Sequence, residues 1–393
     1  MASDPALQRL IDQVQAARAD RQLLDIHGGC TKAFYGGPRQ GQPLDVRPLA
    51  GISSYEPTEL VVTARGGTPL AELEAVLAER GQCLPFEPPR FSGAGLAAEV
   101  AAALTKGAMA GTGASPEPGA DLSGETVGGM VAAGLAGPAR ATMGGVRDHV
   151  LGVKLLSGRA ELLNFGGTVM KNVAGYDVSR ALAGSLGVLG VICEVSLKVL
   201  PVASATITLR QPASQAEAIQ RLNKWGGQPL PIHATAWWEG MLVLRLSGAH
   251  AAVDSARQQL GGEVIESELA ARFWQGLRDH QDEFFNSAAK AVESGASLWR
   301  LSVPATTPAI PLSGEQLLEW GGAQRWICTS APAATLREAA AAVGGHAVLF
   351  RSKDKSAGAF APLSPALAKI QRELMLAFDP EGVFNPGRLW PQG

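Results

Sequence analysis

The sequence predicts an α+β fold built from a glycine-rich domain and an inserted second domain. Within the 393-residue chain, residues 126–201 carry glycines at nearly every turn, with short strands and helices between them. The composition changes after Pro201, because seven of the eight tryptophans lie between Trp225 and Trp326. This change indicates a domain boundary, and the mixture of strands and helices beyond it favours an α+β arrangement.

The glycine-rich stretch is typical of a site where a large, flat molecule contacts the main chain. Glycine costs backbone entropy, so its density predicts positive φ angles or close approach of a ligand. Residues 150–156 and 161–165 predict a β-hairpin, and Asp177 is expected to cap a short helix. Apolar and polar side chains alternate in residues 191–200, which predicts a strand with one buried face. A bound cofactor is the simplest interpretation.

The N-terminal segment leads into another pair of glycines. Residues up to about Gln22 have the apolar spacing of an amphipathic helix, and residues 23–26 predict a short strand. The strand runs into His27-Gly28-Gly29-Cys30-Thr31-Lys32, where consecutive N–H groups can point at one anion such as a pyrophosphate, and Lys32 can add positive charge. The same glycines are compatible with a simple turn, so both interpretations stay open from the residues alone.

Two further helical segments are expected before the glycine-rich stretch. A strand over residues 59–64 precedes Thr68-Pro69, which predicts the start of a helix. Residues 92–125 are rich in alanine and glycine and favour a short helix with a Gly/Pro/Ser tail. Residues 93–98 carry the GxGxxA spacing of a dinucleotide fold, but proline-rich sequence stands where that motif needs a strand, so we reject it.

The second domain is expected to interleave strands and helices. Strands are predicted at residues 205–210, 234–238, 241–246, 298–303, 325–329 and 347–351, and helices at 215–223, 251–260 and 269–285. Strands interleaved with helices and joined by hairpins favour a ferredoxin-like α+β domain.

The chain closes with a helix and a turn-rich tail. Ser364-Pro365 predicts the helix start, and Leu367, Ile370, Leu374 and Phe378 share one face. The following FDPEGVFNPGRL is compatible with two successive turns.

Three motifs in order carry a family resemblance. They are TVGGMVAAGLAGP, GGVRDHVLG and KNVAGYDVSRALAGSLGVLGVICEVSLKVLP, within residues 126–201. They resemble the FAD-binding domain of the vanillyl-alcohol-oxidase, or PCMH, type, and most closely the FAD-binding subunits of glycolate oxidase. The resemblance implies a two-subdomain PCMH-type FAD-binding domain in residues 1–201 and a ferredoxin-like cap in residues 202–345. Residues 346–393 would return to the FAD-binding domain.

The resemblance implies FAD as the cofactor and assigns its contacts to specific positions. Its pyrophosphate loop falls on the first glycine pair, where Cys30 replaces the usual third glycine. The thiol is either a covalent tether or a small residue tolerated where only the main chain contacts the phosphates. Tyr176 and Asp177 are further polar candidates, although Lys171 and Asp177 are equally compatible with a structural ion pair. The implied contacts are Gly28, Gly29, Cys30, Thr31, Lys32, Ala33, Pro85, Thr126, Gly128, Gly129, Ala133, Gly134, Asp148, Lys171, Asn172, Gly190, Val191 and Asn385.

Charge and cysteine content exclude several classes of protein. With 34 basic and 36 acidic residues, the chain has no basic face that would argue for nucleic acid. The four cysteines are widely spaced without a C-x-x-C pair, so neither a disulfide framework nor an iron–sulfur or zinc site is expected. No secretion signal or transmembrane run is recognised, which favours a cytoplasmic protein, peripheral at the inner membrane only through partners.

No catalytic residue is assigned from the sequence. Oxidation of a 2-hydroxy acid needs a base and a carboxylate-binding cation, which catalytic relatives supply with clustered histidines and cap arginines. The six histidines here form no H-x-H or H-x-x-x-H pair, so no metal site is predicted. Leu186 and Val188 also replace the Glu and Thr common in those relatives.

Three functions remain open, and the first is favoured. In the first, the chain would be an FAD-binding subunit of a glycolate oxidase complex and would pass electrons between a catalytic flavoprotein subunit and an iron–sulfur subunit. Alternatively it is a self-sufficient FAD-dependent dehydrogenase of the D-lactate type, or a structural subunit without redox chemistry. The missing histidine cluster argues against the second function, and the nearly intact flavin motifs argue against the third.

Overall fold

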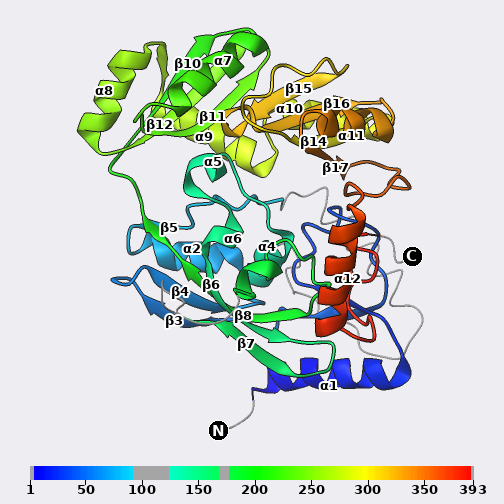
Figure 1. The fold of residues 1–393 in the computed structure, drawn as a ribbon. Coiled ribbons are helices and arrows are strands. Elements are labelled where there is room, and N and C mark those ends of the chain that lie inside the picture. The colour runs from blue at the N-terminus through cyan, green and yellow to red at the C-terminus, as the bar shows by residue number, and fades with distance from the viewer. Residues whose placement is uncertain (1–3, 92–123, 168–176, 391–393) are drawn as a thin grey trace.

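Two antiparallel sheets divide the chain into the two lobes seen in Figure 1. The computed structural model describes residues 4–91, 124–167 and 177–390. A five-stranded sheet lies in the first lobe and an eight-stranded sheet in the second. Helices and strands are mixed in both lobes, which confirms the predicted α+β class.

The first lobe is built on β8, which pairs with β4 on one side and β6 on the other. The sheet order is β3-β4-β8-β6-β7, and β1 and β2 form a separate parallel pair. The bounds are β1 Leu24–His27, β2 Gln42–Asp45, β3 Ile52–Glu56, β4 Val61–Arg65, β6 Val150–Leu156, β7 Leu162–Gly166 and β8 Val191–Lys198. β8 is buried more fully than its alternation predicts, because Ser196 is covered and its hydroxyl lies 2.8 Å from that of Thr63.

The helices of the first lobe lie around this sheet and the parallel pair, except α5, which lies against the second lobe (Figure 1). They are α1 Pro5–Asp20, α2 Leu70–Ala78, α4 Val127–Ala133, α5 Arg140–Met143 and α6 Val146–His149. The predicted N-terminal helix is confirmed, with Leu10 and Val14 buried. Helix α2 is also confirmed, but Thr68 does not cap it, because its hydroxyl exchanges hydrogen bonds with the backbone of Gly51 at 3.0 Å.

The helix expected after Asp177 is a single 3-10 turn, η2 (Ser179–Leu182). The Asp177 carboxylate accepts a hydrogen bond from the Ser179 hydroxyl and pairs with Arg180 at 3.0 Å. It therefore anchors the turn through side chains instead of capping a helix through the backbone. Lys171, its alternative partner, lies outside the described residues.

The cap sheet consists of two halves with the same strand order, of which the first is ferredoxin-like and the second, all of which the structure describes, has no helix between its first two strands. In the first half, β10, α7, β11, β12, α8 and β13 follow one another, and the strand order is β13-β10-β12-β11. The second half, in the order β15-β16-β14-β17, joins it through antiparallel pairing of β11 with β15. The bounds are β10 Ala205–Pro212, α7 Gln215–Gly226, β11 Ile232–Trp238, β12 Met241–Gly248, α8 His250–Leu260, β13 Glu263–Ile265, β14 Ser297–Ser302, β15 Glu315–Glu319, β16 Gln324–Thr329, α11 Ala333–Ala342 and β17 His346–Arg351.

Two sequence predictions in the cap need correction. The single helix expected over residues 269–285 is two helices, α9 (Ser267–Asp279) and α10 (Glu283–Glu293). His280 adopts a left-handed conformation with φ 57° and ψ 45°, and Asp282 caps α10 by accepting a hydrogen bond from the Phe285 N–H. The boundary predicted at residue 346 is also too early, because β17 is the edge strand of the cap sheet.

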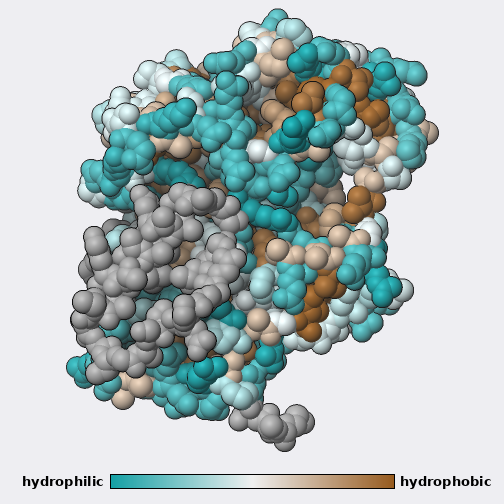
Figure 2. Space-filling model, turned by 180° about the vertical axis from the view of Figure 1, so that it is seen from behind, coloured by the Kyte–Doolittle hydropathy of each residue, from teal (hydrophilic) through white to brown (hydrophobic). Residues whose placement is uncertain are grey.

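Helix α12 (Pro365–Phe378) runs along the outside of the first lobe (Figure 1). Ser364 caps it as predicted, by accepting a hydrogen bond from the Leu367 N–H. None of its residues is fully buried, and only the C-terminal part of its apolar face packs on the first-lobe core. The face seen in Figure 2 is mostly hydrophilic, with its hydrophobic residues in separate patches. In the described parts of the chain, every helix is too short or too polar to traverse a bilayer.

The two lobes share one apolar cluster. Tyr35, Phe91 and Leu186 of the first lobe pack in the same cluster as Trp326 and Phe350 of the cap. The aromatic rings meet edge to face, with Phe34 5.4 Å from Phe350 between ring centroids. This continuity fixes the cap to the first lobe.

A buried carboxylate lies beside this cluster. Glu319 is 3% exposed, and its Oε2 accepts hydrogen bonds from Trp326 Nε1 at 2.7 Å and Gln324 Nε2 at 2.9 Å. Burial raises the pKa of Glu319 from its ordinary value of 4.5 to about 7. Within the described residues, Gln324 Oε1 is buried without a hydrogen-bond partner.

Replacing Glu319 with Gln should flatten the pH dependence of stability. Between pH 4.5 and about 7, the folded wild type binds more protons at Glu319 than the unfolded chain, so its free energy of unfolding falls as pH rises. We expect E319Q to lack that decline, worth up to about 3 kcal/mol. Urea unfolding at pH 5 and pH 8 measures it. E373Q, at an exposed helical ion pair, is the control and should keep the wild-type slope. An E319Q slope equal to that of wild type would contradict the prediction.

Candidate functional site

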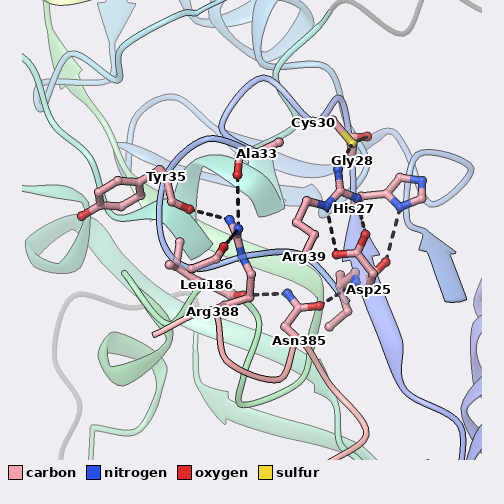
Figure 3. A network of polar contacts seen from close by, with 12 residues as sticks. Asp25, His27, Gly28, Cys30, Ala33, Tyr35, Arg39, Leu186, Asn385 and Arg388 are labelled. Atoms are coloured by element: carbon pink, nitrogen blue, oxygen red, sulfur yellow. Dashed lines mark hydrogen bonds and ion pairs between the residues drawn. The ribbon is translucent and has the colours of Figure 1, made fainter. Parts of the chain in front are cut away.

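A cavity of about 120 Å³ lies where four segments of the first lobe meet. The segments are the end of β1 with the loop after it, the start of α4, the turn before β8, and the C-terminal tail. Its lining comprises Asp25, Ile26, His27, Gly28, Gly29, Cys30, Thr31, Lys32, Ala33, Arg39, Val46, Thr126, Gly128, Gly129, Ala132, Ala133, Leu186, Gly187, Gly190, Ile192, Asn385 and Arg388. Figure 3 shows the polar network beside it.

The loop after β1 presents main-chain donors to the cavity. Among the described residues, no acceptor is bonded to the N–H groups of residues 28–32. Cys30 has φ 57°, in the left-handed region, and the Ala33 N–H closes the turn onto the Cys30 carbonyl at 2.9 Å. Successive N–H groups around a left-handed residue form a concavity suited to an anion.

Two glycines let this loop approach the start of α4. A Cβ on Gly28 would lie 2.3 Å from the Thr126 hydroxyl oxygen, and a Cβ on Gly29 would lie 1.7 Å from the Gly124 carbonyl oxygen. Thr126 caps α4 by accepting a hydrogen bond from the Gly129 N–H at 3.2 Å. The glycine pair is therefore required by the packing of loop against helix.

Cys30 is held by a neighbouring ion pair. Arg39 Nη1 lies 3.2 Å from the Cys30 sulfur, while the same guanidinium binds both carboxylate oxygens of Asp25 (Figure 3). Burial raises the pKa of the Cys30 thiol above its usual range. A protonated thiol at a left-handed position favours the interpretation that only the main chain of this residue contacts a ligand.

Lys32 is paired inside the protein. Its ammonium lies 3.7 Å from a carboxylate oxygen of Glu125 and 5.5 Å from the centroid of the Phe91 ring. Both charged side chains are at most 10% exposed. Burial lowers the pKa of Lys32 to about 8, with Glu125 opposing that effect. The positive charge expected at the loop is thus largely compensated by Glu125.

The C-terminal tail closes the cavity through two side chains. Asn385 Oδ1 accepts a hydrogen bond from the Ile26 N–H and its Nδ2 donates to the Leu186 carbonyl, both at 2.7 Å. Arg388 is 6% exposed, and its guanidinium donates to the carbonyls of Ala33, Tyr35 and Gly37 (Figure 3). The tail therefore joins β1, the loop after it and the turn before β8.

The cavity gathers most of the positions implied by the sequence resemblance. Pro85, Gly134, Asp148 and Val191 do not line it, and Lys171, Asn172 and Tyr176 lie outside the described residues. Asp148 instead accepts a hydrogen bond from the Gly145 N–H at 2.8 Å. The positions that line it are Gly28, Gly29, Cys30, Thr31, Lys32, Ala33, Thr126, Gly128, Gly129, Ala133, Gly190 and Asn385.

Several lining residues were missed by the sequence analysis. Arg39 and Arg388 are the clearest, and Asp25, His27 and Leu186 accompany them. Arg388 follows the turn residues NPG in the tail, so the arginine beside that turn was an available signal. Arg39 follows a glycine–proline turn, and nothing in the sequence around it indicated that it would line the cavity.

The histidines of the described residues have separate surroundings. His27 Nδ1 lies 3.3 Å from the Asp25 carbonyl, and burial lowers the His27 pKa. His149 contacts the Met143 carbonyl at 2.8 Å, and His280 stacks on Phe285 with ring centroids 3.7 Å apart. No group of three or more His, Cys, Asp or Glu suited to a metal occurs in the part of the chain that the structure describes.

Comparison with known proteins places this chain among flavoproteins. A family model described as an FAD binding domain matches residues 7–110. Glycolate oxidase subunit GlcE of Escherichia coli K12 is 44% identical over 385 residues, covering 98% of this chain and 97% of that protein. D-lactate dehydrogenase of Anaerostipes hadrus is 35% identical over 183 residues, 46% of this chain and 38% of that protein.

Solved structures agree on the fold. A structure of alkyldihydroxyacetonephosphate synthase superposes with a TM-score of 0.58 at 14% sequence identity, covering 96% of this chain and 74% of that one. At this identity the likeness concerns the fold alone. It extends over both lobes and supports the predicted PCMH-type architecture.

Replacing Asn385 with Ala should destabilise the first lobe. The change leaves the Ile26 N–H and the Leu186 carbonyl buried without partners, so the free energy of unfolding should fall by about 2–4 kcal/mol. Urea unfolding followed by circular dichroism measures this loss. The control is N286A, at an exposed asparagine that donates one hydrogen bond to the Gln281 carbonyl, and it should lose less than about 1 kcal/mol. Equal losses in the two variants would contradict the bridging role.

Proposed function

Since this chain belongs to the family of glycolate oxidase subunit GlcE, an FAD-binding family, we propose that it is the FAD-binding subunit of a glycolate-oxidising complex. The observation that most strongly supports this proposal is the extent of the match to GlcE, which spans 98% of the chain and therefore both lobes and the C-terminal tail. The D-lactate dehydrogenase match covers 46% of the chain.

The loop after β1 is the proposed site of the FAD pyrophosphate. Its N–H groups over residues 28–32 carry no acceptor among the described residues, and they suit the oxygen atoms of a diphosphate. The volume of about 120 Å³ is below the roughly 300–1,000 Å³ of pockets that enclose a whole drug-sized ligand. The cavity thus matches the phosphate portion of the cofactor. Bound FAD would supply a two-electron acceptor within the complex.

The separate surroundings of the histidines favour an electron-transferring subunit over a self-sufficient dehydrogenase. A 2-hydroxy acid needs a cation for its carboxylate and a base for its hydroxyl proton. In the described residues, His27, His149 and His280 lie in different parts of the fold, against the Asp25 carbonyl, the Met143 carbonyl and the Phe285 ring, and do not form a cluster that could act as that base. Substrate oxidation is therefore assigned to a flavoprotein partner, and electrons pass onward to an iron–sulfur partner.

The partial match to D-lactate dehydrogenase supports a second candidate. In that alternative, this chain by itself oxidises a small 2-hydroxy acid such as D-lactate. A structural subunit that carries no flavin is the third possibility. The three differ in what the isolated chain does with flavin and substrate.

Purified alone and loaded with FAD, the chain should show an oxidised flavin spectrum that anaerobic glycolate or D-lactate does not bleach. The reason is that the histidines of the described residues form no cluster that could take the proton of the substrate hydroxyl. Absorbance at the flavin band measures this, and the control adds dithionite to show that the flavin can be reduced. Bleaching by either acid would establish the self-sufficient dehydrogenase, and absence of flavin would favour the structural subunit.

Replacing Gly29 with Ala should weaken FAD binding at least about tenfold. The new Cβ would lie 1.7 Å from the Gly124 carbonyl oxygen, so the loop must shift and its N–H groups with it. Quenching of flavin fluorescence on titration of the apoprotein measures the dissociation constant. G226A is the control, because a Cβ there meets nothing within 4 Å at the end of α7. Wild-type affinity in G29A would refute the placement of the phosphates at this loop.

A further inference from the structure

Two cations divide the carbonyl groups of residues 33–37 between them. Arg388 donates hydrogen bonds to the odd-numbered carbonyls, those of Ala33, Tyr35 and Gly37. Lys355 donates to the even-numbered carbonyls, those of Phe34 and Gly36, the latter at 3.1 Å. Every carbonyl of this segment therefore has a charged donor, which makes these hydrogen bonds stronger than neutral ones.

The two cations come from different parts of the fold. Arg388 lies in the C-terminal tail of the first lobe, whereas Lys355 follows β17, the edge strand of the cap sheet. Burial, together with the neighbouring charges of Arg388 and Arg351, lowers the pKa of Lys355 to about 8. An ammonium in such surroundings needs its carbonyl partners, because a buried charge without hydrogen bonds is costly.

The cap contacts the same segment with further side chains. The Arg351 guanidinium lies 3.6 Å from the centroid of the Phe34 ring, and Arg300 Nη2 donates to the Tyr35 hydroxyl at 3.0 Å. Tyr35 also packs against Phe350, with ring centroids 5.3 Å apart. The cap thus holds residues 34–36, which lie just beyond residues 28–32 and their N–H groups.

We propose that Lys355 is a positioning residue that couples the seating of the cap to the order of the phosphate-binding loop and so to the affinity for FAD. The inference rests on the proposed FAD site. The hydrogen bonds of Lys355 in the described residues go to the carbonyls of Phe34 and Gly36, and not to residues 28–32. By fixing these two carbonyls, Lys355 keeps the preceding turn in one conformation. The first lobe then binds FAD tightly only while the cap is in place.

The test replaces Lys355 with Met in the full chain and uses Lys353→Met as the matched control. Lys353 lies two residues away and pairs with Glu293 at 3.0 Å on the exposed surface. In K355M we expect the FAD dissociation constant to rise about tenfold, which corresponds to the loss of about one charge-assisted hydrogen bond. Amide hydrogen exchange of residues 28–37 in the apoprotein should also become faster. K353M should match wild type in both measurements, and Lys355→Arg should recover part of the affinity.

Each outcome decides the proposal. Wild-type exchange and affinity in K355M would overturn it, provided circular dichroism shows K355M folded. Faster exchange with unchanged FAD affinity would overturn it as well, because loop order would then not set the affinity. Should K355M fail to fold, Lys355→Gln carries the test, because it removes the charge while keeping a hydrogen-bond donor, and wild-type exchange and affinity in that variant would overturn the proposal. Failure of the proposed FAD site is distinct, because wild type itself would then bind no FAD. Bleaching of the wild-type flavin by glycolate or D-lactate would separately contradict the proposed electron-transferring role.

Discussion

The amide of Asn385 is the contact on which the candidate site depends, because it joins segments that are remote in the sequence. It accepts a hydrogen bond from the Ile26 N–H at the end of β1 and donates one to the Leu186 carbonyl before β8. The Asn385 N–H also binds the Leu24 carbonyl at 2.9 Å. A short side chain with one donor and one acceptor group can satisfy the strand and the turn at once. The tail thereby completes the lobe that the N-terminal strand begins.

The charged side chains around the cavity find their partners within the protein itself. Arg39 pairs with Asp25, Lys32 pairs with Glu125, and Arg388 binds main-chain carbonyls. Unpaired cations in such surroundings would be costly, so the fold supplies their partners internally. An anionic cofactor would consequently be bound mainly by neutral main-chain N–H groups. In the proposed function the loop would hold the diphosphate through these donors, and the cap would help to keep the loop ordered.

The fold was predictable where a periodic pattern extends over a whole element. The first half of the cap, from β10 to α8, follows the predicted strands and helices closely. The sequence prediction did not divide residues 269–285, because neither glycine nor proline stands at the break and only the structure shows His280 in a left-handed conformation. β2, β3 and β15 were not predicted, since each is short and partly polar and acquires its pairing only from neighbouring strands.

By itself the sequence determined the composition of this site: a glycine pair after a short strand, the glycine-rich stretch that begins at Thr126, and the family to which these motifs belong. These are local features, because a turn, a helix cap or a positive φ depends on a few adjacent residues. Only the tertiary structure decided that Asn385 bridges β1 and the turn before β8 and that Arg388 and Lys355 share the carbonyls of residues 33–37. Asn385 lies 199 residues from Leu186 along the chain, and the other pairs are more than three hundred residues apart, so only folding brings them within hydrogen-bond distance.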